Sequence, residues 1–167
     1  MIPFPNNTAI TASDGPLGIS DKRLLHLRSV GRRAADLSRE LFGFSPEKQR
    51  SMFVLGFLHD IGYEYTTDQR QHEHIGGDIL AFMGMDGWQA IYDHGDPDIE
   101  EMSDELIILN MADMQTDGYG RPVTAEERLA DIKTRYGEGS EQFVRANHLL
   151  DNLRRQLAAR GKDPRLI

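Results

Sequence analysis

The sequence predicts an all-α protein that forms a single compact helical bundle, and three observations lead to this fold class. Apolar residues recur at intervals of three and four along most of the chain, which is the spacing of one face of a helix. No long stretch alternates apolar and polar residues with the period of two that is typical of strands. Between the apolar segments stand Ser, Thr, Pro and Gly residues of the kinds that begin and end helices.

The first 19 residues are expected to form an irregular arm, followed by one helical domain over residues 20–167. The arm contains three prolines, two asparagines and two glycines, which favour turns over regular structure. It lacks the basic start and the apolar centre of a signal peptide. A chain of 167 residues is long enough for one domain with a substantial core.

Helix start and stop signals then divide the domain into seven helices. Ser45, Pro46 and Glu47 form a typical start, with a capping hydroxyl, a proline in the first turn and an acid near the positive end of the helix dipole. Thr124 and Glu127 have the spacing of a capping box. The expected helices cover residues 20–42, 45–60, 70–83, 88–93, 103–116, 124–137 and 140–160.

Composition excludes several classes of function. The chain has no cysteine, which excludes disulfide scaffolds, thiolate zinc sites and cysteine nucleophiles. It carries 19 basic and 27 acidic residues, and this net charge of −8 predicts that neither a nucleic acid polymer nor an anionic membrane is a partner. Its longest apolar runs fall far short of the ~20 residues that a membrane span needs. We therefore expect a cytoplasmic protein. The net charge does not exclude a small phosphorylated ligand, and base rates leave a homodimer open.

Two expected helices carry acids where the sequence predicts burial. The segment 53–65 is apolar nearly all round its helix, yet it contains His59 and Asp60. In the segment 106–117, Asn110 and Asp113 interrupt an apolar run. A buried carboxylate is costly unless it is paired or coordinated, and neither run contains a Lys or Arg. A cation from elsewhere is therefore expected at both acids.

Histidines on other expected helices favour a metal ion as that cation. Neutral imidazoles cannot neutralise carboxylates, but they are good ligands for a divalent metal. The predicted ligands are His26, His59, Asp60, His74, His94 and Asp113. They suit one or two ions, and Asp60 could bridge two. Nitrogen and oxygen donors favour iron or manganese, with magnesium, zinc, cobalt and nickel as alternatives. His72 is expected to face solvent, although a shifted helix start would exchange its role with that of His74.

This ordered set resembles the HD-domain superfamily of metal-dependent phosphohydrolases. The similarity extends over roughly residues 22–117 and includes "HLRSV", "FLHDIGY", "HIGGDIL" and "NMADMQTD". It implies an all-α bundle of the HD-domain type that cleaves a phosphate ester or anhydride bond in a small nucleotide-like substrate. One departure is Tyr63, which stands where many relatives have a lysine that helps to hold phosphate.

The resemblance also suggests roles for single residues. Asp60 is expected to be the catalytic residue, as a metal ligand that orients the attacking water. Arg28 and Arg121 are expected to bind phosphate charge, and Tyr63 to donate a hydrogen bond to the substrate. Two other functions stay open, namely an HD-type di-iron oxygenase and a non-catalytic metal-dependent nucleotide sensor.

Overall fold

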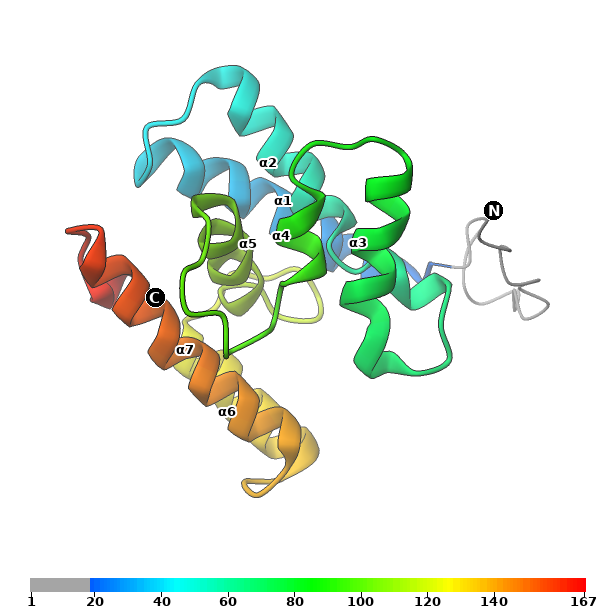
Figure 1. Cartoon of the computed structure of the whole chain (residues 1–167). Coiled ribbons are helices and arrows are strands. Elements are labelled where there is room, and N and C mark those ends of the chain that lie inside the picture. Colours follow the sequence, from blue (N-terminus) through cyan, green and yellow to red (C-terminus); the bar gives the residue numbers. More distant parts are fainter. Residues whose placement is uncertain (1–18) are drawn as a thin grey trace.

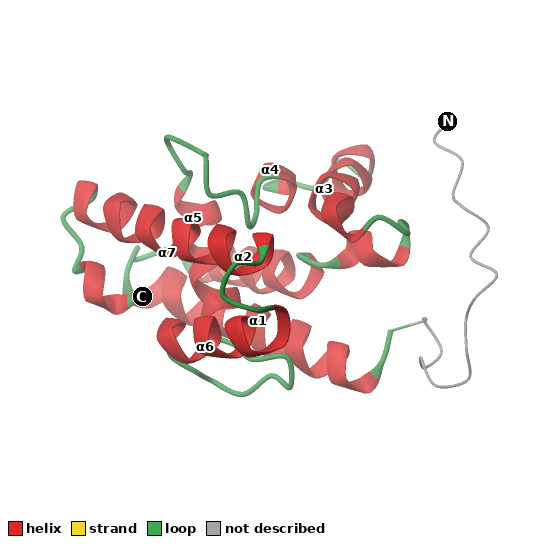
Figure 2. Cartoon of the chain, turned by 90° about the horizontal axis from the view of Figure 1, so that it is seen from below, coloured by secondary structure: helices red, strands yellow, loops and turns green. Residues whose placement is uncertain are grey.

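The computed structural model describes residues 19–167 and consists of helices joined by loops (Figures 1 and 2). The all-α prediction is confirmed, and the arm expected over residues 1–19 lies almost wholly outside the described residues. Within residues 19–167 the only strand-like pairing is one isolated bridge between Thr116 and Pro122. The helices are α1 (Asp21–Glu40), α2 (Pro46–Leu58), α3 (His72–Phe82), α4 (Trp88–Tyr92), α5 (Asp104–Met114), α6 (Ala125–Tyr136) and α7 (Glu141–Ala159), with short 3-10 helices η1 (Ile61–Glu64), η2 (Gln69–Gln71) and η3 (Pro164–Leu166).

Hydroxyl side chains begin most of the long helices, at the positions that the sequence predicts. In each case the side-chain oxygen accepts a hydrogen bond from the backbone N–H three residues later, which satisfies one of the free donors of the first turn. At Thr124 the capping box is complete, because Glu127 also accepts from the Thr124 N–H. The capping residues are Ser20, Ser45, Ser103, Thr124 and Ser140.

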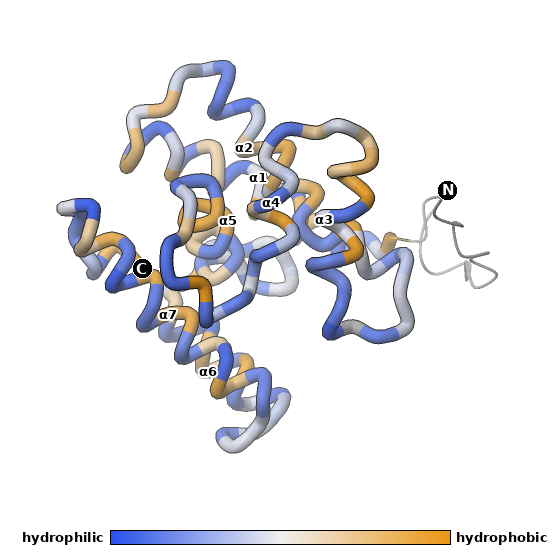
Figure 3. Tube along the Cα trace, in the orientation of Figure 1, coloured by the Kyte–Doolittle hydropathy of each residue, from blue (hydrophilic) through white to orange (hydrophobic). Residues whose placement is uncertain are grey.

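Helix α5 forms the centre of the core. Every residue from Leu106 to Ala112 is buried, and the helix packs against α1, α2, α4 and α7. It lies in the middle of the molecule in Figure 1, and Figure 3 shows apolar segments on α5 and its neighbours. Asp113, on the last turn of this central helix, is therefore held by an element that is fixed on several sides. No helix in the described part of the chain is long and apolar enough to cross a membrane.

Two glycines allow α1 and α2 to cross in backbone contact. A Cβ atom on Gly56 would lie 2.8 Å from Gly31 Cα, and one on Gly31 would lie 2.7 Å from the Phe53 carbonyl oxygen. Larger residues at these positions would force the two helices apart. The close crossing brings the helix that carries His26 against the helix that ends at His59.

Helices α6 and α7 form a hairpin on one side of the molecule (Figure 1). Polar side chains of α7 hold the loop that precedes α5. Asn152 Nδ2 donates to the carbonyl oxygens of Pro97 and Ile99, both at 2.9 Å. Gln156 Nε2 donates to the Glu100 carbonyl oxygen at 2.7 Å. These bonds satisfy backbone groups of a loop that has no regular structure of its own.

Two helix boundaries differ from the sequence prediction in ways that affect the site. Helix α2 ends at Leu58, so His59 and Asp60 lie at its C-terminal end, where the chain turns into η1. Helix α3 begins at His72 rather than near residue 70, because residues 69–71 form the 3-10 turn η2. The remaining ends agree with the prediction to within about three residues.

Candidate metal centre

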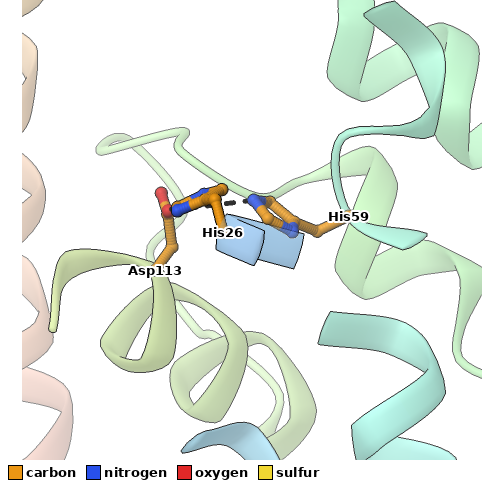
Figure 4. Close-up of side chains that lie close together, drawn as sticks. All are labelled: His26, His59 and Asp113. Carbon is orange, nitrogen blue, oxygen red and sulfur yellow. Dashed lines mark ion pairs between the residues drawn. The ribbon is translucent and has the colours of Figure 1, made fainter. Parts of the chain in front are cut away.

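Four imidazoles and two carboxylates from distant parts of the chain meet at one place. In the half centred on Asp113, the Oδ1 atom lies 3.2 Å from His26 Nε2 and 3.7 Å from His59 Nε2 (Figure 4). Both histidine rings are buried, whereas 30% of the Asp113 side chain remains exposed. This half is assembled from α1, α5 and the end of α2.

The other half is centred on Asp60. Its Oδ1 atom lies 3.4 Å from His59 Nε2, 3.3 Å from His72 Nε2 and 3.7 Å from His94 Nε2. Its second oxygen, Oδ2, accepts a hydrogen bond of 2.9 Å from Arg23 Nη1. His59 contacts both carboxylates and therefore joins the two halves.

The separations between these nitrogen and oxygen atoms fit ligands of a shared cation. They range from 3.2 to 3.7 Å, which is longer than most well-formed hydrogen bonds. Donor atoms at 2.0–2.2 Å from one metal ion are separated from each other by roughly 2.8–3.1 Å in octahedral geometry and roughly 3.3–3.6 Å in tetrahedral geometry. The side chains thus stand close to the spacing of ligands around a divalent metal, with the two longest separations slightly above it.

The opposite nitrogen of each imidazole is already engaged. Nδ1 of His26 lies 2.9 Å from the Asp117 carbonyl oxygen, and Nδ1 of His59 lies 2.8 Å from that of Gly56. Nδ1 of His94 lies 2.7 Å from the Ile91 carbonyl oxygen. Since a carbonyl oxygen only accepts, Nδ1 must donate, and the lone pair of each neutral ring is left on Nε2.

His72 and His59 complete this pattern. His72 Nδ1 lies 3.1 Å from Glu73 Oε2, so a carboxylate takes the place of the carbonyl oxygen there. The Nε2 atom of His59 is buried and has no hydrogen-bond partner among residues 19–167. A buried polar atom without a partner is costly. A metal ion at this point would satisfy it, so the residues present fit the cation that the sequence predicts.

The pKa values of these groups follow from their mutual contacts. Burial lowers the pKa of His59, which keeps its ring neutral and able to ligate. Burial alone would raise the pKa of Asp60 and of Asp113, but the neighbouring histidines outweigh it and hold both values below the usual range. Burial likewise opposes protonation of His26, yet the hydrogen bond with Asp113 raises the pKa of this ring. Both acids are therefore ionised at neutral pH.

Three groups of side chains within the described range have the spacing to hold an ion. Two of them, His26–His59–Asp113 and His72–Glu73–His94, share no residue. The third, His59–Asp60–His94, lies between them and takes one member from each. The arrangement therefore has donors for two cations, with Asp60 between them. Glu73 was not among the predicted ligands.

The prediction that His74 belongs to this cluster requires correction. His74 is exposed and its ring stacks on Tyr92 at a centroid distance of 4.4 Å, whereas His72 is buried beside Asp60. Residues two apart on a helix point about 200° apart, so only one of the two histidines can face the cluster. The later start of α3 selects His72, together with Gly76 and Leu80 on the same buried face.

A pair of alanine variants tests this exchange of roles. We expect His72→Ala to lower the affinity for the second equivalent of metal by about 10- to 100-fold or more, because an Nε2 ligand is lost. His74→Ala removes an imidazole two residues away and is expected to leave metal binding unchanged. Metal titration by calorimetry, with metal content measured by elemental analysis, gives both values. Equal losses in the two variants would contradict the placement of His72.

The residues expected to bind substrate are only partly brought to this centre. Tyr63 lies against it, with its ring stacked on His72 at 3.8 Å. Arg28 is exposed on α1 and does not line the cleft beside the cluster. Arg121 is 73% exposed and pairs with Asp117 at 2.7 Å in an adjacent hollow. Arg28 does not reach the cleft because it is two residues from His26 on α1 and projects to the opposite side of that helix.

An open cleft of about 410 Å³ leads to the cluster, and its walls are rich in basic side chains. His26, Asp60 and Tyr63 are among the residues that line it. Four cations line it as well, and sequence reasoning identified none of them: Lys22, Arg23, Arg128 and Arg135. In a chain with a net charge of −8, this concentration of positive charge favours an anionic ligand at the mouth of the centre.

Comparison with known proteins gives one match. A model of the HD domain family matches residues 23–132, which is more than half of the chain. No curated protein and no solved structure matches the chain significantly. HD domains bind divalent metals and are in general metal-dependent hydrolases, which agrees with the groups of His and Asp side chains described above. The chain therefore belongs to the HD domain family.

Proposed function

We propose that this protein hydrolyses a phosphate ester or anhydride bond of a small nucleotide-like substrate. The observation that carries the proposal is that a cluster of potential metal ligands lies beside a cleft with basic walls. The Nε2 atoms of four histidines converge on the carboxylates of Asp60 and Asp113, and the cleft that opens onto them is lined by Lys and Arg side chains. The first feature suits a divalent cation, and the second suits a phosphate group.

The proposed ligands are His26, His59, Asp60, His72, His94 and Asp113, with Glu73 beside His72. Nitrogen and oxygen donors without thiolate suit iron or manganese, and the two disjoint groups suit two ions. A divalent cation bound there would supply Lewis acidity toward a water molecule and a phosphoryl oxygen.

The chain's own residues would contribute orientation and charge. Asp60 is ionised, and its Oδ2 is fixed by Arg23, so its position is set before any substrate enters. Asp60 also lines the cleft, where its carboxylate can accept a hydrogen bond from the attacking water. Burial raises the pKa of Tyr63, so its phenol stays protonated and can donate to a substrate oxygen.

Phosphate release is the experiment that tests this proposal. Protein reconstituted with Mn²⁺ or Fe²⁺ is expected to release phosphate or a nucleotide product from at least one member of a panel of nucleotides and simple phosphate esters. Removal of the metal with a chelator is expected to stop the reaction, and Asp60→Asn to slow it by about 100-fold or more. If metal-loaded protein released no product from any member of the panel, this result would count against hydrolysis.

The same preparation separates the two alternatives. Substrate-dependent oxygen uptake by the iron form, without phosphate release from the panel, would assign the protein to di-iron oxygenases. Tight binding of a nucleotide without turnover would indicate a sensor. Phosphate release without oxygen uptake supports the hydrolase.

A further inference from the structure

The four cations that line the cleft differ in how closely they are paired with other groups of the protein. Arg23 donates to Asp60 at 2.9 Å, and its guanidinium lies over the Tyr63 ring. Arg135 pairs with Asp131 at 2.6 Å and is 45% exposed. Lys22 lies over the exposed ring of Tyr119, at 4.1 Å from its centroid. Each of these three cations therefore already has a close partner.

Arg128 is placed differently. Its side chain is only 14% exposed, and its Nη2 atom lies 4.0 Å from Asp113 Oδ1, the oxygen that also contacts His26 and His59. Its Nη1 atom is buried and makes no hydrogen bond to any group of the described chain, although Asp131 Oδ2 lies 3.6 Å away. Arg128 thus lines a cleft that is open to solvent beside the proposed metal centre, and its guanidinium has a buried donor that no group of the described chain satisfies.

We propose that Arg128 is a catalytic residue that binds the phosphoryl group undergoing hydrolysis, an assignment that rests on the proposed function. The planar guanidinium offers two parallel N–H donors that match two oxygens of a phosphate. Because it adjoins Asp113, an oxygen bound there would also adjoin the proposed metal. Negative charge that develops on the phosphoryl oxygens in the transition state would be met by a group already in place.

A merely structural role for Arg128, the positioning of Asp113 through their ion pair, makes a different prediction. Loss of that role would weaken metal binding, whereas loss of a phosphate ligand would leave metal binding intact and weaken the binding of phosphate. The variants Arg128→Gln and Arg128→Lys separate the two, since lysine keeps the charge but loses the paired donors. Arg154→Gln is a matched control, because Arg154 pairs with Glu126 of α6 at 2.6 Å and does not line the cleft.

The experiment measures metal content, inorganic phosphate binding by calorimetry and turnover of the best panel substrate, all on Mn²⁺-loaded protein. Arg128→Gln is expected to retain its metal, to bind phosphate about 10- to 100-fold more weakly and to lose kcat by a similar factor. Arg128→Lys should recover part of both losses, and Arg154→Gln should match the wild type.

Three outcomes would overturn the assignment. Wild-type phosphate affinity in metal-loaded Arg128→Gln would remove Arg128 from the substrate site while leaving the hydrolase proposal in place. Loss of metal from Arg128→Gln and Arg128→Lys alike would show that Arg128 acts through Asp113. Absence of phosphate binding and hydrolysis in the wild-type protein would overturn the proposed function, and the role of Arg128 with it.

Discussion

Replacement of His59 by alanine is expected to weaken metal binding by more than about 100-fold and to abolish activity. Loss of a residue that hydrogen-bonds to a metal ligand typically lowers metal affinity about 10- to 100-fold, and His59 is itself a proposed ligand. It contacts both Asp60 and Asp113, and it belongs to two of the three candidate metal groups. Loss of this ring would therefore damage both halves of the centre.

The effect is measurable without a substrate. Metal at 100 times its dissociation constant stabilises a folded protein by about 2.7 kcal/mol, which for a chain of this size raises Tm by roughly 5–10 °C. Thermal unfolding with and without Mn²⁺ should show this rise for the wild type and none for His59→Ala. His148→Ala is the matched control, because this histidine is 56% exposed on α7 and its Nδ1 atom lies 3.7 Å from Asp98 Oδ1, away from the metal centre. A full metal-dependent rise in His59→Ala would refute the proposed centre.

Substitution of Gly62 by alanine is expected to be the most damaging single-methyl change in the described chain. The added Cβ would lie 1.8 Å from the His72 carbonyl oxygen, 2.7 Å from the His72 carbonyl carbon and 2.8 Å from Gly76 N. All three are backbone atoms of α3, so no side-chain rotation relieves the clash. Overpacking commonly costs 1–3 kcal/mol, and this case should reach about 3 kcal/mol or more.

Two measurements together test the role of Gly62. Thermal unfolding should show a fall in Tm of roughly 6–12 °C for Gly62→Ala. Metal titration should show the same defect as His72→Ala, because displacement of α3 moves His72 away from Asp60. Gly139→Ala controls for the change in residue type, since nothing lies within 4 Å of a Cβ at that position and it should unfold as the wild type does. An unchanged Tm in Gly62→Ala would mean that α3 does not approach Gly62 so closely.

Most of the fold follows from local signals in the sequence. The capping residues Ser45, Ser103 and Thr124 begin helices as predicted, because a side-chain oxygen that satisfies a free N–H acts within one turn. The conflict between apolar surroundings and the acids Asp60 and Asp113 correctly indicated a place where charges meet. Such a conflict is readable because desolvation of a carboxylate is costly in any fold.

The choice between His72 and His74 depended on helix register, which a start signal defines only to within a few residues. The buried face of α3 holds His72, Gly76 and Leu80 at intervals of four. Counting back from Leu80 would have selected His72. The HD-family pattern around "HIGGDIL" pointed to His74 instead, and it gave no information on which ring faces the centre.

The cations of the cleft were missed for a different reason. Arg23 lies three residues before His26 and therefore on the same side of α1, so helical spacing could have identified it in place of Arg28. Arg128 could not be found in this way. Its approach to Asp113 depends on how the α6–α7 hairpin packs against the rest of the bundle, and no local pattern in residues 124–137 encodes that contact.

The hydrogen bonds from α7 to the loop before α5 limit which insertions and deletions the sequence can accept during evolution. The loop begins just after His94, and Asn110 also holds it by accepting from the Gly95 N–H at 2.9 Å. Deletion of one residue early in α7 would rotate the rest of that helix by about 100°. The amides of Asn152 and Gln156 would then turn away from the carbonyl oxygens that they now satisfy. Helix α7 lies beyond residues 23–132, which match the HD domain family, yet its register determines whether the loop that follows the proposed ligand His94 stays in place.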